Sequence, residues 1–521
     1  MSDFLSPLHG ASPLHGASLT YGASSVRGAT GWVGAIALAG FTLSGCANYA
    51  GLEPQQTLTP ISQLSVTEVL GRTPVSPAAW PEIDWWKRLG DPELDTLIQE
   101  ALSDSPDIAV AQARLHSANA AIASARARAL PSIDASAEVS RSRVSKVEDP
   151  QGQGNFYSTS RSLLVSFDYD LDLWGGSRAA WEAALGEARA QQIEYRAAGL
   201  TLSVNVARAY VSLATAYAMR DVAQRQLDRA QRINDINDEL LRAGIRNESQ
   251  SLQSQVTAAN ARQSLESAQQ SIRSERISLA ILLGKGPDRG ESIPRPTALS
   301  PAIAALPSVI PAELIGHRPD VVAARWRVEA ASQSIKAAKA QFYPNINLSA
   351  MAGFRSALGD YFFSEAAKSG SVTPAISLPI FEGGRLRANL DSTDADYDLS
   401  VAQYNRTIIS ALGEVADDIT TLESLDRQRE SQQEALESAR SAYGLVEERY
   451  RAGLVDYLDV LSSEQQLIST EQSLTQVDSQ RLDRSVQLVQ ALGGGLALDA
   501  AVPHHSGGFV SAPDPNATST K

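Results

Sequence analysis

Four short segments alternate hydrophobic and polar residues with a period of two, which is typical of β-strands whose two faces meet different surroundings. We expect strands at about 132–143, 162–173, 345–355 and 372–381. The last segment is the weakest, because Pro374 and Pro379 lie within it and proline has no N–H for a strand ladder. Each segment is about ten residues long, which is enough for a tilted strand to cross a bilayer.

A very long helical stretch follows each pair of strands. Residues 178–243 and 387–452 contain no proline, and their apolar residues recur with the four-and-three spacing of a coiled-coil seam. At about 1.5 Å per residue, each helix would run on the order of 100 Å. Each stretch then turns at an Ala-Gly pair into a shorter helix, 248–283 or 457–492.

These patterns recur because the sequence itself is duplicated. Residues 106–137 align with 319–350 without a gap, and both segments begin with Pro-Asp. The turn sequence Arg-Ala-Gly at 242–244 recurs at 451–453. We therefore expect two copies of one unit, each with a short helix, two strands, a long helix and a further helix. Two copies are too few for a solenoid, which usually needs about three repeats or more.

The lengths of the helices predict how each unit folds. The helix before the strands, about 107–129 in the first copy, and the helix after the turn together nearly match the long helix, so both can stack beside it. The strands then lie at one end and the turn at the other. Four strands cannot close a barrel, and each unpaired backbone group at an edge in lipid costs several kcal/mol. A trimer would supply about twelve strands; the alternative is a soluble sandwich.

The first 45 residues are typical of a secretory signal. Arg27 precedes an uncharged apolar run at 32–43, which is too short to span a bilayer and leads to Leu-Ser-Gly-Cys46. This ending resembles the lipobox of bacterial lipoproteins and implies a covalent lipid, palmitate included, on Cys46; no other cofactor is expected. The alternative is a buried thiol in a short core helix. Ala47 is not the aspartate that favours inner-membrane retention in such lipoproteins, so we expect the outer membrane.

Composition and charge exclude several function classes. Asp and Glu outnumber Lys and Arg by 59 to 45, and this acidic balance argues against nucleic-acid binding, which needs a basic surface. The single cysteine excludes a disulfide framework. The sequence has no plausible catalytic Ser/His/Asp or Cys/His arrangement, no zinc spacing and no phosphate-binding loop, so we expect no enzyme and no metal site. Asp168, Asp170 and Asp172 share one strand face and point in parallel, which favours a polar lumen over metal ligation.

Taken together, these features resemble the outer-membrane efflux factors of the TolC type, most closely their lipid-anchored NodT-like branch, over about residues 46–495. The resemblance is carried by the lipobox, the Asp-Trp-Trp…Gly-Asp-Pro segment at 84–92, the Gly-Gly pairs after the strands and the paired Arg-Ala-Gly turns. It implies a mainly α protomer of long antiparallel coiled-coil helices and four membrane strands. Three protomers would assemble into an α/β-barrel tunnel that extends from the outer membrane into the periplasm.

The same resemblance implies a function. Such a tunnel is the passive exit duct of a tripartite efflux pump, which joins a periplasmic adaptor and an inner-membrane transporter to export drugs or other toxic small molecules. Two alternatives stay open: a duct for type I protein secretion, and a lipid-anchored periplasmic coiled coil without a pore. The expected parts of the chain are the signal peptide, an equatorial segment, the first repeat, an equatorial linker, the second repeat and a tail, at 1–45, 46–105, 106–284, 285–318, 319–493 and 494–521.

The resemblance also places candidate gate residues near the helical turns, at the expected periplasmic mouth. Tyr450 matches the family's tyrosine before the second turn, and Asp459 matches one carboxylate of its selectivity ring. Three symmetry-related Asp459 groups would favour cations by Coulomb attraction. Position 462, where some members carry a second ring carboxylate, is Ser462. The alternative for Asp459 is a solvated charge on the helix surface.

A salt bridge that ties neighbouring hairpins together in some relatives is expected to be absent, because its positions fall on Gln250 and Val455. Closure of the mouth must then depend on packing or on other polar contacts. The turns themselves are the expected docking surface for the adaptor's helical hairpin, through Gly244, Ile245, Gly453 and Leu454.

Overall fold

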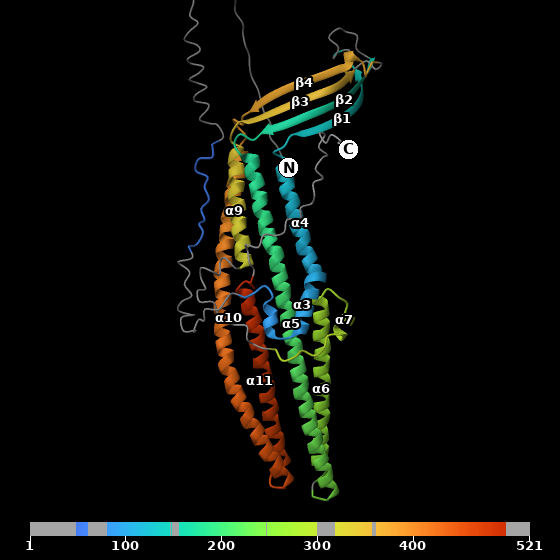
Figure 1. The fold of residues 1–521 in the computed structure, drawn as a ribbon, viewed down its shortest axis with the longest axis vertical. Coiled ribbons are helices and arrows are strands. Elements are labelled where there is room, and N and C mark those ends of the chain that lie inside the picture. Colours follow the sequence, from blue (N-terminus) through green and yellow to red (C-terminus); the bar gives the residue numbers. More distant parts are fainter. Residues whose placement is uncertain are drawn as a thin grey trace, which may run out of the picture.

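A computed structural model of the chain describes residues 48–60, 81–145, 147, 156–245, 247–299, 318–356 and 361–495. The signal segment and Cys46 lie outside these residues, as do most of the inter-repeat linker and all but the first two residues of the C-terminal tail. The described part is a long, narrow protomer with a β-sheet at one end and two helical turns at the other (Figure 1). None of the described helices combines the length and the hydropathy that crossing a membrane requires.

The two repeats have the predicted order of elements. The first consists of α4 (Pro106–Ala127), β1 (Ser132–Val144), β2 (Phe156–Leu171), α5 (Gly176–Arg242) and α6 (Glu248–Leu282). The second consists of α9 (Pro319–Ala340), β3 (Asn345–Ser356), β4 (Lys368–Ser377), α10 (Arg385–Arg451) and α11 (Tyr457–Ala491). The duplication read from the sequence is therefore a duplication of structure.

Local sequence explains where these helices begin and end. Pro106 and Pro319 are the first residues of α4 and α9, where the missing N–H of proline costs nothing. The side chain of Ser105 caps α4 by accepting the N–H of Asp107. The long helices α5 and α10 each begin after a glycine with positive φ, at 72° for Gly175 and 89° for Gly384, which explains the Gly-Gly pairs after the strands.

The four strands form one antiparallel sheet in the order β1-β2-β3-β4. Its register sorts the side chains by face: Ile133 pairs with Phe167 on an apolar face, and Asp170 pairs with Asn347 on the polar one. β1 and β4 are the edge strands, and the outer edge of each pairs with no other described strand.

Two strand predictions need correction. β2 begins at Phe156 instead of 162, because 156–161 pair with 139–144 of β1, although the hydropathy of neither segment alternates with a period of two. β4 spans Lys368–Ser377 instead of 372–381, because Ser377 pairs with Asn345, the first residue of β3, and the chain beyond it has no partner strand. Pro374 lies inside β4, which is possible because β4 is an edge strand of the protomer.

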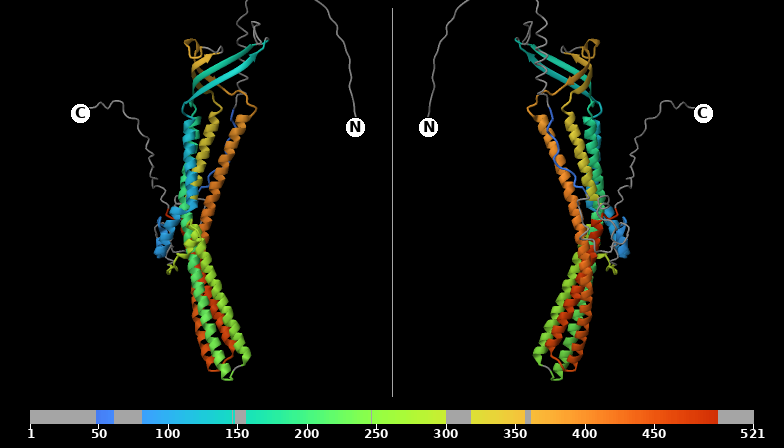
Figure 2. Two further views of the ribbon diagram at one scale, coloured as in Figure 1. Left: turned by 90° about the vertical axis from the view of Figure 1, so that its right-hand side faces the viewer. Right: turned by 90° about the vertical axis from the view of Figure 1, so that its left-hand side faces the viewer.

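The helices stack as their lengths predict. α4 and α6 lie end to end beside α5, and α9 and α11 lie in the same way beside α10 (Figure 1). α9 also packs on α5 and joins the two repeats. Gly186 of α5 is at the crossing, where an added Cβ would lie 3.0 Å from the Cβ of Ala330. Near the turns, the hairpins α5/α6 and α10/α11 lie side by side (Figure 2).

Small elements pack on the helices at mid-height and form the equatorial part of the protomer: η3 (Trp85–Leu89), α3 (Pro92–Asp104) and α7 (Asp288–Glu291). Trp85 and Leu89 are buried against the middle of α5. Buried Asp91 caps α3 by accepting the N–H of Glu93, and it also accepts hydrogen bonds from the hydroxyl of Tyr210 (2.8 Å) and the N–H of Thr297 (2.9 Å). The Trp-Trp and Asp-Pro signatures are thus structural.

Candidate functional site

The two helical turns at the narrow end have the same backbone geometry. Gly244 and Gly453 both adopt a positive φ, 72° and 73°. The N–H of Ile245 donates to the carbonyl of Leu240, and the N–H of Leu454 donates to the carbonyl of Arg449, both at 2.9 Å. This is the Schellman arrangement, which requires a residue that tolerates the left-handed conformation. The repeated Arg-Ala-Gly sequence therefore specifies the turn.

An apolar side chain stands in solvent at the tip of each turn. Ile245 is 67% exposed and Leu454 is 74% exposed. The first turn of α11 adds Leu458, and α6 adds Leu252 and Val256, all exposed. Because exposing apolar side chains to water is unfavourable, this end of the protomer has a surface suited to a partner.

Tyr450 is buried just before the second turn. Its hydroxyl donates to the side-chain carbonyl of Asn237 on α5, which is also fully buried. Its ring lies 6.1 Å from the ring of Tyr457 on α11. Tyr450 therefore joins the hairpin α10/α11 to the hairpin α5/α6 within one protomer, a link that sequence analysis did not predict because the pairing with Asn237 is not local.

Asp459 lies on the exposed side of the first turn of α11, and its carboxylate accepts the N–H of Asp456 at 3.1 Å. With Asp456 as N-cap, this is the reciprocal contact of a capping box, which stabilises the start of the helix. An acidic side chain in the first helical turn also interacts favourably with the positive, N-terminal end of the helix dipole. The capping role does not exclude the predicted ring of carboxylates, which stays a prediction.

The two positions of the missing salt bridge have other local roles. The N–H of Gln250 donates to the side chain of Asn247, which caps α6 (3.1 Å). Val455 packs against the apolar cluster that contains Tyr450 and Tyr457. The second turn is therefore fixed in part by hydrophobic packing.

Sequence analysis missed a buried charge cluster above the turns. The carboxylate of Glu471 on α11 lies 3.3 Å from Arg225 and 3.4 Å from Arg229, both on α5, and 3.7 Å from Arg440 on α10. Arg229 also lies 3.5 Å from Glu464, and burial raises the pKa of Glu464 while the arginine opposes this. The available signal was the spacing: Arg225 and Arg229 are one helical turn apart, and the two glutamates are one heptad apart on α11.

Two of the three strand aspartates have separate hydrogen-bond partners. Asp170 accepts hydrogen bonds from the side-chain amides of Asn345 (3.2 Å) and Asn347 (3.0 Å), and Asp172 accepts the N–H of Arg178 at the start of α5 (2.8 Å). Within the part of the chain that the structure describes, no group of three or more His, Cys, Asp or Glu side chains is suited to a metal ion.

This geometry defines a class of protein: a duplicated protomer with long coiled-coil hairpins below an amphipathic sheet with open edges. The sequence profile of the family described as "Outer membrane efflux protein" matches residues 97–285 and 310–494, which correspond to the two repeats. The chain belongs to the outer membrane efflux protein family.

Individual relatives agree with this assignment. The multidrug resistance outer membrane protein MdtP of Escherichia coli K12 is 32% identical over 470 residues, 87% of this chain and 94% of that protein. The fusaric acid resistance protein FusA of Burkholderia cepacia is 37% identical over 365 residues, 69% of each chain. The crystal structure of VceC from Vibrio cholerae matches with a TM-score of 0.74 and 36% identity, covering 80% of this chain and 100% of that one. The predicted TolC-type fold and outer-membrane channel function are confirmed, and the family is not one of enzymes.

Proposed function

We propose that the chain is the lipid-anchored exit duct of a tripartite pump that exports small toxic molecules, with a periplasmic adaptor docked at the helical turns. One observation supports this most directly: the apolar tips Ile245 and Leu454 protrude from two turns of the same geometry, at the end of the protomer farthest from the sheet (Figure 1). Two equivalent tips per protomer offer an adaptor hairpin a repeated, helix-in-groove surface.

The unpaired surfaces of the protomer support a homotrimer. β1 and β4 leave the two edges of the sheet open, and backbone groups at such edges cannot stay unpaired in lipid. α4 has no buried residue in the isolated protomer. In the trimer β1 of one protomer pairs with β4 of the next, which gives about twelve strands in one wall, and α4 closes the helical wall in the same way.

The segment that follows Cys46 supports a lipid anchor at the membrane end. Residues 48–60, which we call the strap, run along the upper part of α10 (Figure 1). Asn48 and Ala50 accept hydrogen bonds from the guanidinium of Arg387 near the start of α10. The ring of Tyr49 packs on Phe342, next to the start of β3. Cys46 is thus two residues from a site beside the sheet, where acyl chains can enter the membrane.

The cargo is proposed from the relatives. MdtP is named for multidrug resistance and FusA for fusaric acid resistance, so small organic molecules are favoured over the polypeptides of type I secretion. At the mouth, the ring of three Asp459 carboxylates is proposed to favour cations.

The proposal is tested in cells that lack the native protein. Expression of the full chain should restore resistance to a panel of antibiotics, dyes and fusaric acid, and the purified protein should run as a heat-labile trimer that conducts ions in planar bilayers. In Cys46→Ala, chains that have not yet assembled should be found in the soluble fraction, because they lack the lipid that would hold them at the membrane. Monomeric behaviour or absence of conductance contradicts the proposal and favours the coiled coil without a pore.

Docking is tested separately with charges at the tips. Ile245→Asp combined with Leu454→Asp should abolish resistance and crosslinking to the adaptor while conductance persists. The control is Ile83→Asp, which introduces one of these two charges at an isoleucine as exposed as Ile245 (67%) but in the equatorial part. Docking at the turns is contradicted if both variants lose resistance and crosslinking equally, or if neither variant loses them.

A further inference from the structure

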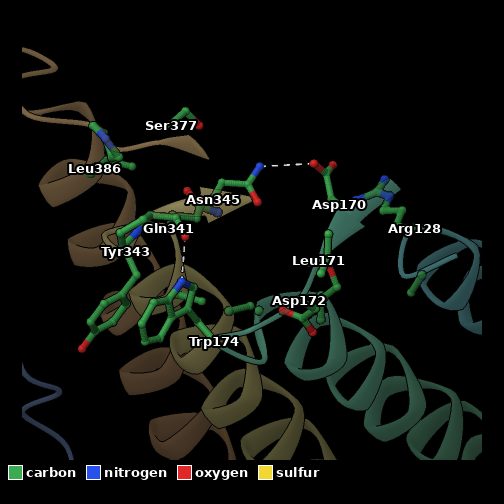
Figure 3. A pocket seen from close by; sticks show the side chains of 18 of the residues that line it. Arg128, Asp170, Leu171, Asp172, Trp174, Gln341, Tyr343, Asn345, Ser377 and Leu386 are labelled. Carbon is green, nitrogen blue, oxygen red and sulfur yellow. Dashed lines mark hydrogen bonds between the residues drawn. The ribbon is translucent and has the colours of Figure 1, made fainter. Parts of the chain in front are cut away.

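A cavity of about 430 Å³ lies where the tops of α4, α5, α9 and α10 meet the sheet. Its floor consists of small residues, Ala125, Gly176, Ala180, Ala337 and Ala340. An added Cβ at Gly176 would lie 2.8 Å from the Cβ of Ala340, so α5 and α9 nearly touch below the cavity. Figure 3 shows the polar and aromatic side chains around this floor. The volume is in the range of pockets that hold drug-sized molecules.

The cavity opens on the polar side of the sheet. Asp170, Asn345 and Ser377 line it, and the register places all three on one face of β2, β3 and β4. Ile346 and Ile376, which pair with each other one residue away, belong to the opposite, apolar face. In a channel the apolar face meets lipid, so the cavity faces the lumen, on the path of the cargo.

One wall of the cavity is an aromatic pair held in place. Trp174 stacks on Tyr343 with ring centroids 4.8 Å apart and planes at 20°. The indole N–H of Trp174 donates to the carbonyl of Pro344 at 2.7 Å (Figure 3). Trp174 nevertheless stays 51% exposed. A large aromatic surface is thus fixed in orientation and available to a ligand, which lowers the entropic cost of binding.

The lining of the cavity holds two carboxylates and two guanidinium groups. Asp170 and Asp172 accept hydrogen bonds only from neutral amide groups and form no ion pair with any described residue. Of the two arginines in the lining, Arg385 is paired with Glu382, which leaves Arg128. With Glu382 counted, three carboxylates and two guanidinium groups lie in or next to the cavity, an excess of one negative charge. Fixed carboxylates beside an aromatic surface are the combination that attracts an organic cation, by Coulomb attraction and cation–π contact.

We propose that this cavity is a transient cargo site for planar aromatic cations, with the ring system on the alanine floor against Trp174 and the positive group at Asp170. The proposal rests on the channel function and adds a substrate class to it. Binding must be weak, because a conducting site has to release its occupant. Two matching variants separate the contributions: Asp170→Asn removes the charge, and Trp174→Leu removes the aromatic surface.

The test is equilibrium binding of ethidium to the detergent-solubilised full-length protein, followed by fluorescence anisotropy. Ethidium should bind one site per chain and weaken at high salt, while the planar anion 8-anilinonaphthalene-1-sulfonate should not compete. Asp170→Asn and Trp174→Leu should each weaken binding about five-fold, and Trp174→Phe should recover most of it. Asp168→Asn is the matched control, since Asp168 lies two residues away on the same strand face but does not line the cavity.

Equal affinity of Asp170→Asn and Asp168→Asn, or competition by the anion, would overturn the cation site. Heat-labile trimer mobility and bilayer conductance of the same samples keep the two claims apart. If the wild-type protein conducts but the variants bind ethidium as tightly as it does, the cargo site alone is contradicted. If the protein does not conduct, the channel proposal is contradicted.

Discussion

The phenol of Tyr450 donates a hydrogen bond to the side-chain carbonyl of Asn237, and both residues are completely buried between the two hairpins of one protomer. Because this contact lies one helical turn from the second tip, separation of the hairpins must break it. A buried hydrogen bond of this kind stabilises the packed arrangement by about 1 kcal/mol, and a buried acceptor left unpaired adds a further cost.

Tyr450→Phe should therefore loosen the closed mouth of the channel. We expect the fraction of time in the open state to rise about five-fold, equivalent to about 1 kcal/mol, and cells to become sensitive to large antibiotics such as vancomycin. Single-channel recording and susceptibility assays measure the two effects. Tyr404→Phe is the control, since Tyr404 is buried in another cluster of α10. An unchanged open fraction in Tyr450→Phe would show that this link does not restrain the mouth.

The carboxylate of Glu471 should be the most sensitive charge near the turns. Its three arginine neighbours come from two helices, and Glu471→Ala leaves Arg229 buried with only the more distant Glu464. Loss of one partner from a buried pair typically costs about 3–5 kcal/mol, whereas an exposed pair contributes about 1 kcal/mol or less. The exposed pair Arg429–Asp478 joins α10 to α11, as the contact of Glu471 with Arg440 does, and supplies the control, Asp478→Ala.

Native-state hydrogen exchange of α5 and α11 measures this difference. Amides of both helices near Glu471 should exchange at least a hundred-fold faster in Glu471→Ala than in Asp478→Ala, because an opening cost lower by about 3 kcal/mol corresponds to that ratio. Equal exchange in the two variants would mean that the cluster contributes no more than a surface pair.

Repetition and periodicity made most of the fold predictable from the sequence. The bounds of α5, α6, α10 and α11 lie within two residues of expectation, because a coiled-coil seam and an Ala-Gly turn are local signals. The ends of β2 and β4 were not predictable, because they are set by the partner strand and not by alternation within the segment. In the same way, Asn237 and Glu471 meet their partners across helices that are distant in sequence.

The site residues show the same division. The glycines at the turns were predictable, because a positive φ leaves a mark in the sequence. The capping contact of Asp459 was also legible in principle, since Asp456 precedes it by three residues at the start of a helix. The cavity at the sheet was not predictable, because its walls come from segments of both repeats that are distant in sequence.

Asp91 should hold the equatorial part on the long helices. Burial favours the neutral acid, yet the hydrogen bonds from Tyr210, Thr297 and Glu93 hold the pKa of Asp91 below its ordinary 3.8. A lowered pKa means that the carboxylate contributes stability above about pH 4 and that this contribution is lost as the pH falls through the lower folded-state value. Tyr210→Phe should destabilise the equatorial part by about 1.5–3 kcal/mol at pH 7, the usual range for a hydrogen bond to a charged group.

Limited proteolysis between residues 81 and 105 reports the state of this part of the protomer. Cleavage should accelerate in Tyr210→Phe at pH 7 and in the wild type below pH 4. Tyr217→Phe is a suitable control, because Tyr217 lies on the same helix and its hydroxyl accepts a hydrogen bond from Arg276 instead. Identical cleavage of both variants would contradict a special role for the Asp91 contact.

The last prediction concerns Asp394, a buried carboxylate of α10 close enough to Glu53 of the strap to feel its charge. Asp394 of α10 is only 4% exposed, and neither of its oxygens has a hydrogen-bond partner among the described residues. One turn further on, Asp398 accepts the N–H groups of Gln55 (3.0 Å) and Gln56 (2.8 Å) from the strap. Burial raises the pKa of Asp394; Lys339 opposes this, while nearby Asp391, Asp398 and Glu53 reinforce it.

Docking of the strap should therefore take up a proton. Because the docked state has the higher pKa, it is most stable below the ordinary value of 3.8 and weakens as the pH rises through the raised value. Asp394→Asn should dock more tightly at pH 7 and lose this dependence, whereas Asp396→Asn, an exposed neighbour on the same helix, should behave as the wild type. Protease cleavage within 48–60, measured from pH 4 to 8 and expressed relative to Asp394→Asn, gives the result, because that variant corrects for the pH dependence of the protease itself. A wild-type strap whose protection is flat over this range, or strongest at high pH, would mean that Asp394 is solvated and that docking of the strap does not depend on its protonation.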